Sequence, residues 1–120
     1  MISNTVDRGK RGEAIVVEYL RKRGYTIRAT NLHFRYGELD IVAEKDGALV
    51  VVEVKSQGYF SQIEPELAVT PLKLLKLRRC IALLLHDLYS QRVHFKTVQL
   101  DVIGVARGKV VSHIQNIESA

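Results

Sequence analysis

The stretch from Gly37 to Lys55 constrains the fold of this 120-residue chain more than any other part of it. It reads GELDIVAEKDGALVVVEVK, two apolar-rich runs on either side of Asp46-Gly47. Asp-Gly between alternating apolar runs is one of the strongest short-range signals for a β-hairpin. A turn made of those two residues alone pairs Lys45 with Ala48 and so sets the register of both strands.

Counting outward from this turn places charged side chains opposite each other on one face of the hairpin. Asp40 lies opposite Glu53 and Glu38 opposite Lys55, because side chains alternate between faces along a strand. Directly opposed side chains are about 5 Å apart at Cβ, where like charges repel. Two carboxylates so placed need a cation, and Mg²⁺ fits because it prefers oxygen ligands and is commonly held by one or two carboxylates. The alternative is a solvated ladder of salt bridges.

The apolar side chains of the hairpin predict that both of its faces are covered by other elements. The face without charges is expected to carry Leu39, Ile41, Ala43, Val50, Val52 and Val54. The charged face also carries apolar side chains towards the turn: Val42, Leu49 and Val51. The charges are therefore expected at one open end.

Hydrophobic periodicity and turn signals predict the remaining elements. They are a helix at 8–23, strands at 25–31, 93–105 and 110–114, and a helix at 71–88. The order α-β-β-β-α-β-β predicts an α/β (α+β) fold with a mixed central sheet and a helix on each side. The length indicates one domain, 1–120, with residues 1–7 and 115–120 expected to be loose. Residues 56–69 form an irregular loop of the kind that often carries function.

The second helix is expected to have an apolar side and a basic side. Its buried side should consist of Leu72, Leu75, Leu77, Ile81, Leu84, Leu85 and Leu88. Its basic side carries Lys73, Lys76, Arg78 and Arg79. This side either faces solvent or contacts phosphates. A net charge of +5 is consistent with a polyanionic partner.

Aromatic and basic residues alternate in the link at 32–37, just before the acidic cluster. Aromatic faces can stack on unpaired bases while arginine holds phosphate, so Arg35 and Tyr36 are candidate nucleic-acid contacts. The alternative is a loop whose aromatic side chains fold back onto the core. Asp101, in the strand at 93–105, is a candidate outer member of the acidic group.

Several classes of protein are excluded or disfavoured by what the sequence lacks. The longest apolar run, Cys80 to Leu85, is far short of the roughly 20 residues that a membrane span needs. The polar start predicts no signal peptide, and a single cysteine, expected to be buried, fits the reducing cytoplasm. The four histidines lack zinc-ligand spacing, and the chain has neither a P-loop nor GxGxxG.

The acidic residues carry a resemblance to known proteins. Glu13 on the first helix, Asp40 on one strand and Glu53-Val54-Lys55 on the next resemble the E…D…ExK signature of the PD-(D/E)XK nuclease superfamily. The arrangement is similar to that of archaeal Holliday-junction resolvases. More closely, GKRGE at 9–13, GELDIVA, VVEVKS, the Thr-Pro-x-Lys start of the second helix and LDVIGV resemble the bacterial YraN family over nearly the whole chain. This resemblance implies a restriction-endonuclease-like α-β-β-β-α-β core.

The resemblance also implies roles for individual residues. Asp40 and Glu53 would bind Mg²⁺ or Mn²⁺ together with the carbonyl of Val54, and Glu13 would complete the shell through a water molecule. Lys55 would orient or polarise the attacking water. Without the resemblance, Glu13 is equally an acid favoured by the dipole in the first turns of its helix.

Three positions leave more than one interpretation open. Glu38 matches the family pattern without a clear role, and a pairing with Lys55 is one candidate. Gln57 and Gln99 stand where the family usually has arginine, which would weaken phosphate binding if those arginines serve it.

The implied activity is metal-dependent hydrolysis of DNA, at branched or single-stranded structures. Junction-cutting relatives often act as dimers, so a homodimer is one arrangement to expect. A nucleic-acid-binding or assembly module that retains the fold without catalysis is the alternative. A third interpretation is an acidic cluster that serves only a protein partner.

Overall fold

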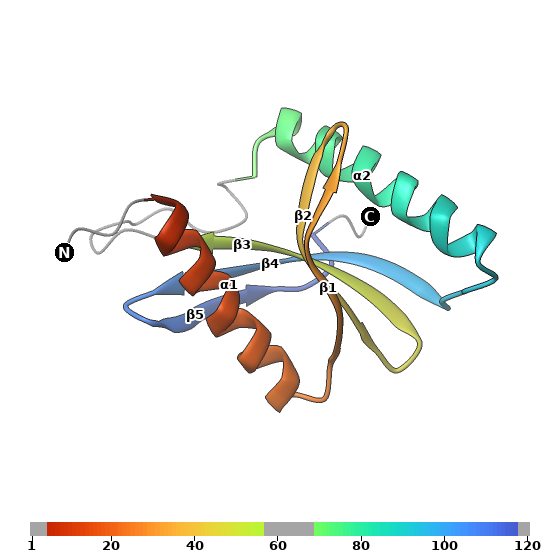
Figure 1. Cartoon of the computed structure of the whole chain (residues 1–120). Helices are drawn as coiled ribbons and strands as arrows, with labels where there is room; N and C mark the ends of the chain where they lie inside the picture. The colour runs from red at the N-terminus through yellow and green to blue at the C-terminus, as the bar shows by residue number, and fades with distance from the viewer. Residues whose placement is uncertain (1–4, 57–68, 118–120) are drawn as a thin grey trace.

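The computed structural model of the chain describes residues 5–56 and 69–117. Its elements occur in the predicted order (Figure 1). They are α1 (Thr5–Lys22), β1 (Thr26–Phe34), β2 (Gly37–Lys45), β3 (Ala48–Ser56), α2 (Pro71–Ser90), β4 (Thr97–Ala106) and β5 (Lys109–Ile114). The mixed α/β fold class is confirmed. Most of the loop expected at 56–69, including Gln57, lies outside the described residues.

The five strands form one sheet whose order, β1-β2-β3-β4-β5, follows the sequence. β3 and β4 are parallel, and every other neighbouring pair is antiparallel. A parallel pair needs a long crossover, and α2 lies within that connection. The helices α1 and α2 pack on opposite faces of the sheet (Figure 1). Neither helix of the described ranges is long and apolar enough to span a membrane.

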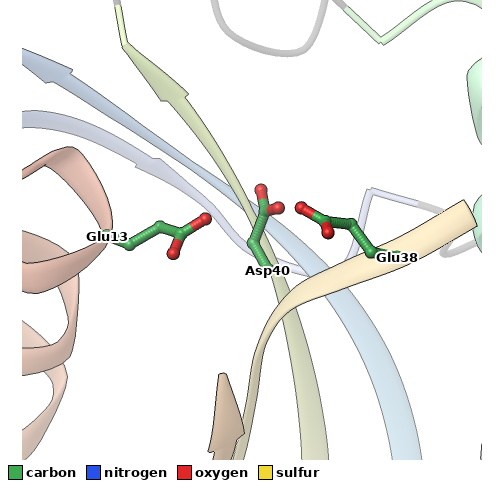
Figure 2. A group of neighbouring side chains, drawn as sticks. All are labelled: Glu13, Glu38 and Asp40. Carbon is green, nitrogen blue, oxygen red and sulfur yellow. The ribbon is translucent and has the colours of Figure 1, made fainter. Parts of the chain in front are cut away.

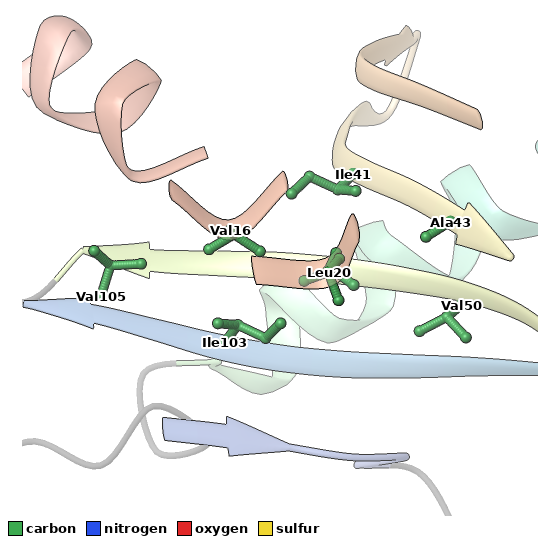
Figure 3. Packing of buried hydrophobic residues seen from close by; sticks show 8 residues of the cluster. Val16, Leu20, Ile41, Ala43, Val50, Ile103 and Val105 are labelled. Atoms are coloured by element: carbon green, nitrogen blue, oxygen red, sulfur yellow. The ribbon is translucent and has the colours of Figure 1, made fainter. Parts of the chain in front are cut away.

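Each helix covers its own hydrophobic core. On one face, Val16 and Leu20 of α1 pack onto the inner strands (Figure 3). The strand residues of this core are Ile41, Ala43, Val50, Val52, Ile103 and Val105. On the other face, α2 packs on a second core that contains Leu39, Val42, Leu49, Val51 and Leu100. Burial on both faces explains why β3 is apolar at nearly every position.

The β2–β3 hairpin has the predicted turn and register. Lys45 pairs with Ala48, and the ladder continues outward as predicted. Asp46 and Gly47 both have positive φ, at 52° and 83°, as a two-residue hairpin turn with the twist of its strands requires.

This ladder ends at Ile41 and Val52, so the predicted direct pairing of Asp40 with Glu53 is not part of it. Beyond this point β2 diverges from β3 (Figure 1). The Val54 N–H instead donates to Asp40 Oδ2 at 2.9 Å. A carboxylate thus replaces the main-chain acceptor that a continued ladder would supply.

Divergence of β2 also corrects the predicted face of Leu39. The alternation rule places Leu39 beside Ile41, but Leu39 packs in the α2-side core while Ile41 packs in the α1-side core. The bent first part of β2 pairs with β1, and Leu39 lies opposite Leu32 of β1. A local bend therefore overrides strict alternation.

The link at 32–37 is a second hairpin and not a loop. β1 continues to Phe34, which pairs with Gly37, so Arg35 and Tyr36 form the turn. Gly37 has φ 147°, which glycine adopts more readily than other residues. Arg-Tyr is not a typical turn dipeptide, which is why the turn signals did not predict this hairpin.

The first turns of α2 depart from the predicted burial. Leu77, Cys80 and Leu84 are buried as expected, but Leu72 and Leu75 are 62% and 42% exposed. Leu74 is partly buried against the α2-side core, and the fully buried residues of α2 begin at Leu77.

A polar network fastens the C-terminal segment to the sheet. Asp101 is fully buried and accepts hydrogen bonds from Gln99 Nε2 and the Asn116 N–H, both at 2.9 Å. His113 joins Asp101 at 2.8 Å and Tyr19 of α1 at 3.0 Å. Asp101 is therefore an anchor on the α1 side of the sheet and not an outer member of the acidic group.

This network bears on two further positions. The N–H groups of Asn116 and Ile117 bond to β4, so the end expected to be loose is tied down as far as residue 117. The Gln99 amide donates to Asp101, so Gln99 belongs to this network.

Replacing Asp101 by asparagine should lower the free energy of unfolding by about 1–2 kcal/mol, the scale of one disrupted buried hydrogen bond. An asparagine amide would face His113 Nε2 donor to donor unless the imidazole changes tautomer. Urea unfolding measures the effect, with Asp87→Asn on the exposed part of α2 as the control. Equal stabilities of the two variants would contradict the proposed role of Asp101.

Candidate functional site

Three carboxylates meet where β2 diverges from β3 (Figure 2). Glu13 comes from α1, and Glu38 and Asp40 come from β2. One carboxylate oxygen of each lies within 4.8 Å of the others, and Asp40 stands between the other two (Figure 2). Like charges repel at this distance, so the arrangement favours a cation or a bound proton.

Asp40 is the most constrained of the three. The hydrogen bond from the Val54 N–H fixes its carboxylate against β3. Burial raises the pKa of Asp40, and the Glu38 charge raises it further. The Val54 N–H, Lys73 and Lys55 act in the opposite direction because they favour the charged form.

Glu13 reaches the site because α1 runs close to the end of β3. A Cβ atom on Gly12 would lie 2.5 Å from Ser56 Oγ, so the absence of a side chain permits this approach. Burial raises the pKa of Glu13, a hydrogen bond from Asn31 lowers it, and the charges of Asp40 and Glu38 raise it again. Glu13 is therefore more than a solvated acid of a first helical turn.

Glu53 lies beside this group but is held differently. It is 3% exposed, and burial followed by the Asp40 charge raises its pKa to about 7. Its Oε1 faces Lys73 Nζ at 3.4 Å and Lys55 Nζ at 3.8 Å. Its Oε2 is buried with no hydrogen-bond partner among the described residues. An unpaired buried carboxylate oxygen is costly, which points to a ligand or a proton.

The structure thus brings together most of the predicted acidic residues, in a different grouping. Glu13 and Asp40 are in contact range of Glu38, whereas Glu53 is the neighbouring group that interacts electrostatically with Asp40. Glu38 Oε2 lies 3.1 Å from His33 Nδ1, so the partner described for Glu38 is His33, not Lys55.

The donor set suits a hard divalent cation. Every candidate ligand is an oxygen, and the three grouped carboxylates come from two elements, α1 and β2, with Glu53 of β3 beside them. Mg²⁺ and Mn²⁺ accept such oxygen ligands. The partnerless Oε2 of Glu53 adds an oxygen that nothing among the described residues satisfies.

Three of the predicted nucleic-acid contacts, Arg35, Tyr36 and Arg79, lie together. Arg35 lies 4.8 Å and Arg79 5.3 Å from the ring centroid of Tyr36, which joins the β1–β2 turn to α2. Arg35 also donates to the Tyr36 hydroxyl at 2.8 Å. Lys76 is exposed on the same helix as Arg79, and Lys73 of that helix faces Glu53.

Two features of the site were not predicted from sequence. Asn31 adopts φ 51° and bonds Glu13; its advance signals were that it matches the family pattern and that asparagine tolerates this conformation. A cleft of about 730 Å³ borders Glu13 between α1 and β1. Its lining consists of Lys10, Glu13, Ala14, Val17, Glu18, Arg21, Thr30 and Asn31.

A mixed sheet of this order with a helix on each face defines an α+β protein, consistent with a restriction-endonuclease-like core. Residues 12–105 match Uncharacterised protein family UPF0102, the YraN family. The chain belongs to this family, which confirms the family resemblance of the sequence motifs.

Three similar relatives are each called a UPF0102 protein. The protein from Syntrophomonas wolfei is 40% identical over 109 residues, which cover 91% of this chain and 92% of the relative. The protein from Persephonella marina is 37% identical over 109 residues, covering 91% and 90%. The protein from Flavobacterium psychrophilum is 34% identical over 116 residues, covering 95% and 92%.

Proposed function

We propose that this protein is a divalent-metal-dependent endonuclease that hydrolyses phosphodiester bonds of DNA at branched or single-stranded structures. The convergence of Glu13, Glu38 and Asp40 within 4.8 Å, beside the buried Glu53, is the observation that carries the proposal. A salt-bridge ladder on a solvated hairpin does not account for it, because Glu53 is buried and one of its oxygens has no partner among the described residues.

The roles follow the nuclease resemblance, with one addition from the geometry. Asp40 and Glu53 would hold Mg²⁺ or Mn²⁺ with the Val54 carbonyl, and Glu13 would complete the shell through water. Glu38 is added because its carboxylate lies in the same group. When bound, such an ion supplies a nucleophilic water at neutral pH, neutralises charge on the phosphate and stabilises the leaving oxygen.

The chain's own residues would position the reacting groups. The Val54 N–H keeps the Asp40 carboxylate in one orientation, and Glu53 is buried on β3 beside Lys73 of α2. Lys55, on the strand that carries Glu53, would hold the attacking water or an oxygen of the scissile phosphate. Fixed groups of this kind stabilise developing charge without reorganising during the reaction.

Substrate would lie across the surface of Tyr36, Arg35, Arg79 and Lys76. Guanidinium groups bind phosphate well, and an aromatic ring beside them can contact an unpaired base. Arg79 and Lys76 share α2 with Lys73, which pairs with Glu53, so a strand bound along this helix would reach the acidic group at Lys73.

Cleavage of a panel of labelled DNAs tests the proposal. The panel contains single-stranded, duplex, flapped and four-way DNA, each incubated with Mg²⁺, Mn²⁺ or EDTA. We expect cutting with either metal and none with EDTA, and we expect Lys109→Ala on the exposed start of β5 to behave as the unmodified protein. Binding that survives EDTA, with no cutting of any member, would instead support a non-catalytic binding or assembly module.

Replacing Arg79 by alanine should weaken DNA binding about 5- to 30-fold without regard to sequence, because a charge-assisted phosphate contact is lost. The slope of log affinity against log salt should become less steep by about one. Fluorescence anisotropy at several salt concentrations measures both quantities, with Lys109→Ala as control. An unchanged affinity would place the substrate elsewhere.

A further inference from the structure

Lys73 lies in the first turn of α2, and its side chain reaches Glu53 in the acidic site. A helix cap fixes the position of this turn. Thr70 has an extended backbone, and its side chain accepts the Lys73 N–H at 3.1 Å. Pro71 begins the helix directly afterwards. The cap therefore determines where the Lys73 side chain leaves the helix, and this side chain is 43% exposed.

The contact that Lys73 makes is shared with another cation. Lys73 Nζ lies 3.4 Å from Glu53 Oε1, and Lys55 Nζ lies 3.8 Å from the same oxygen. Two ammonium groups thus face one oxygen of Glu53, while the other oxygen has no partner among the described residues. The charges of Lys73 and Lys55 also lower the pKa of Asp40.

Lys73 also differs from Lys55 in what surrounds it. Lys55 belongs to the sheet, whereas Lys73 shares its helix with Lys76 and with Arg79, which lies over Tyr36. Lys73 is consequently the cation that joins the acidic group to the basic surface. A phosphate that reaches the carboxylates from this surface passes its ammonium group.

We infer that Lys73 is a second catalytic lysine, which contacts a non-bridging oxygen of the scissile phosphate and gives up Glu53 to do so. The inference rests on the proposed function and adds the residue that receives the phosphate. The exchange needs no change of fold, because an exposed lysine has a flexible stem with three rotatable N–H donors. It explains why Glu53 has two cationic neighbours in the free protein.

The test compares Lys73→Ala with Lys109→Ala, a lysine on the exposed start of β5 that lies outside the proposed substrate surface. At saturating protein, the single-turnover rate of cleavage should fall about 10- to 100-fold for Lys73→Ala, the scale of a charge-assisted hydrogen bond. Lys109→Ala should leave that rate unchanged. Lys73→Arg should restore part of the rate because it keeps a donor and a charge.

A binding measurement supplies a readout independent of cutting. With Ca²⁺, the affinity of Lys73→Ala for DNA should be about tenfold lower than that of the unmodified protein, whereas in EDTA the two affinities should be similar. Lys76→Ala, which removes a contact of the proposed substrate surface, should lower the affinity for DNA by the same factor with Ca²⁺ and in EDTA. Far-ultraviolet circular dichroism spectra should be alike for all three proteins, which checks that the fold is retained.

The outcomes separate this inference from the proposed function. If the unmodified protein cuts DNA and Lys73→Ala cuts equally fast, Lys73 is an ion pair that only holds α2 against β3, and the inference fails alone. Equal losses of affinity for Lys73→Ala in Ca²⁺ and EDTA would overturn it as well. If the unmodified protein cuts no DNA with any metal, the proposed function fails and the inference fails with it.

Discussion

Replacing Asp40 by asparagine should slow metal-dependent cleavage of DNA at least about a thousandfold while leaving the fold intact. The asparagine carbonyl can still accept the Val54 N–H, so the local structure is retained. The charge that attracts the cation is lost at the centre of the carboxylate group. Losses of this size are typical when a fixed electrostatic contribution to a transition state is removed.

Lys55→Ala should cause a loss of similar size for a different reason, because it removes the group that would hold water or phosphate while leaving every carboxylate in place. Cleavage rates and far-ultraviolet circular dichroism of both variants, with Asp87→Asn as a surface control, measure the effect. Full activity of either variant would show that the proposed site is wrong.

Replacing Glu53 by glutamine should have opposite effects on activity and on stability. Cleavage should be lost with the carboxylate, but the metal-free variant should be more stable than the unmodified protein at pH 8. The pKa of Glu53 is raised from 4.5 to about 7 by burial and by the Asp40 charge. One pKa unit corresponds to about 1.4 kcal/mol, so the cost of the buried charge is about 3 kcal/mol.

The direction of the pH dependence follows from proton binding. Between about pH 4.5 and 7 the folded protein retains a proton on Glu53 that the unfolded chain has released. The free energy of unfolding of the metal-free protein therefore falls as the pH rises from about 4.5 to 7. Above this range the full cost of burying the Glu53 charge remains. The raised pKa of Asp40 acts in the same direction.

Urea unfolding at pH 5 and pH 8 in EDTA measures this effect. The gain in stability of Glu53→Gln should be large at pH 8 and small at pH 5. Added Mg²⁺ should stabilise the unmodified protein at pH 8 and have little effect on the variant, because ligands stabilise the state that binds them. A variant less stable than the unmodified protein at pH 8 would contradict this account of Glu53.

Local signals predicted the elements and one register of this fold. The Asp46-Gly47 turn predicted the pairing of Lys45 with Ala48, and Thr70-Pro71 predicted the start of α2. Both depend on neighbouring residues, whose conformational preferences are readable from sequence. The same counting did not predict that the ladder ends at Ile41, because strand divergence depends on what packs against β2.

The composition of the candidate site was predictable where a motif carried it, and its geometry was not. Glu13 lies more than twenty residues before Asp40, and only the packing of α1 brings the two together. Alternation placed Glu38 on the face of Asp40 but could not show that Glu13 reaches both of them. The basic pattern of α2 could not show that Lys73 turns towards Glu53 while Lys76 stays exposed.

Buried polar contacts were the least predictable part of the molecule. Asp101 is an acidic residue among apolar ones in β4, a pattern that fits a site as well as an anchor. Its partners come from the end of the chain and from β5, so only the folded structure distinguishes the two.

Anomalous diffraction from crystals of the protein soaked in Mn²⁺ tests the central claim most directly, because it locates a bound ion without depending on the choice of substrate. We expect one strong peak within coordination distance of Asp40 and Glu53, and no peak there in crystals of Asp40→Asn. A peak elsewhere, or no peak beside intact and ordered carboxylates, would contradict the metal site and the nuclease activity built on it.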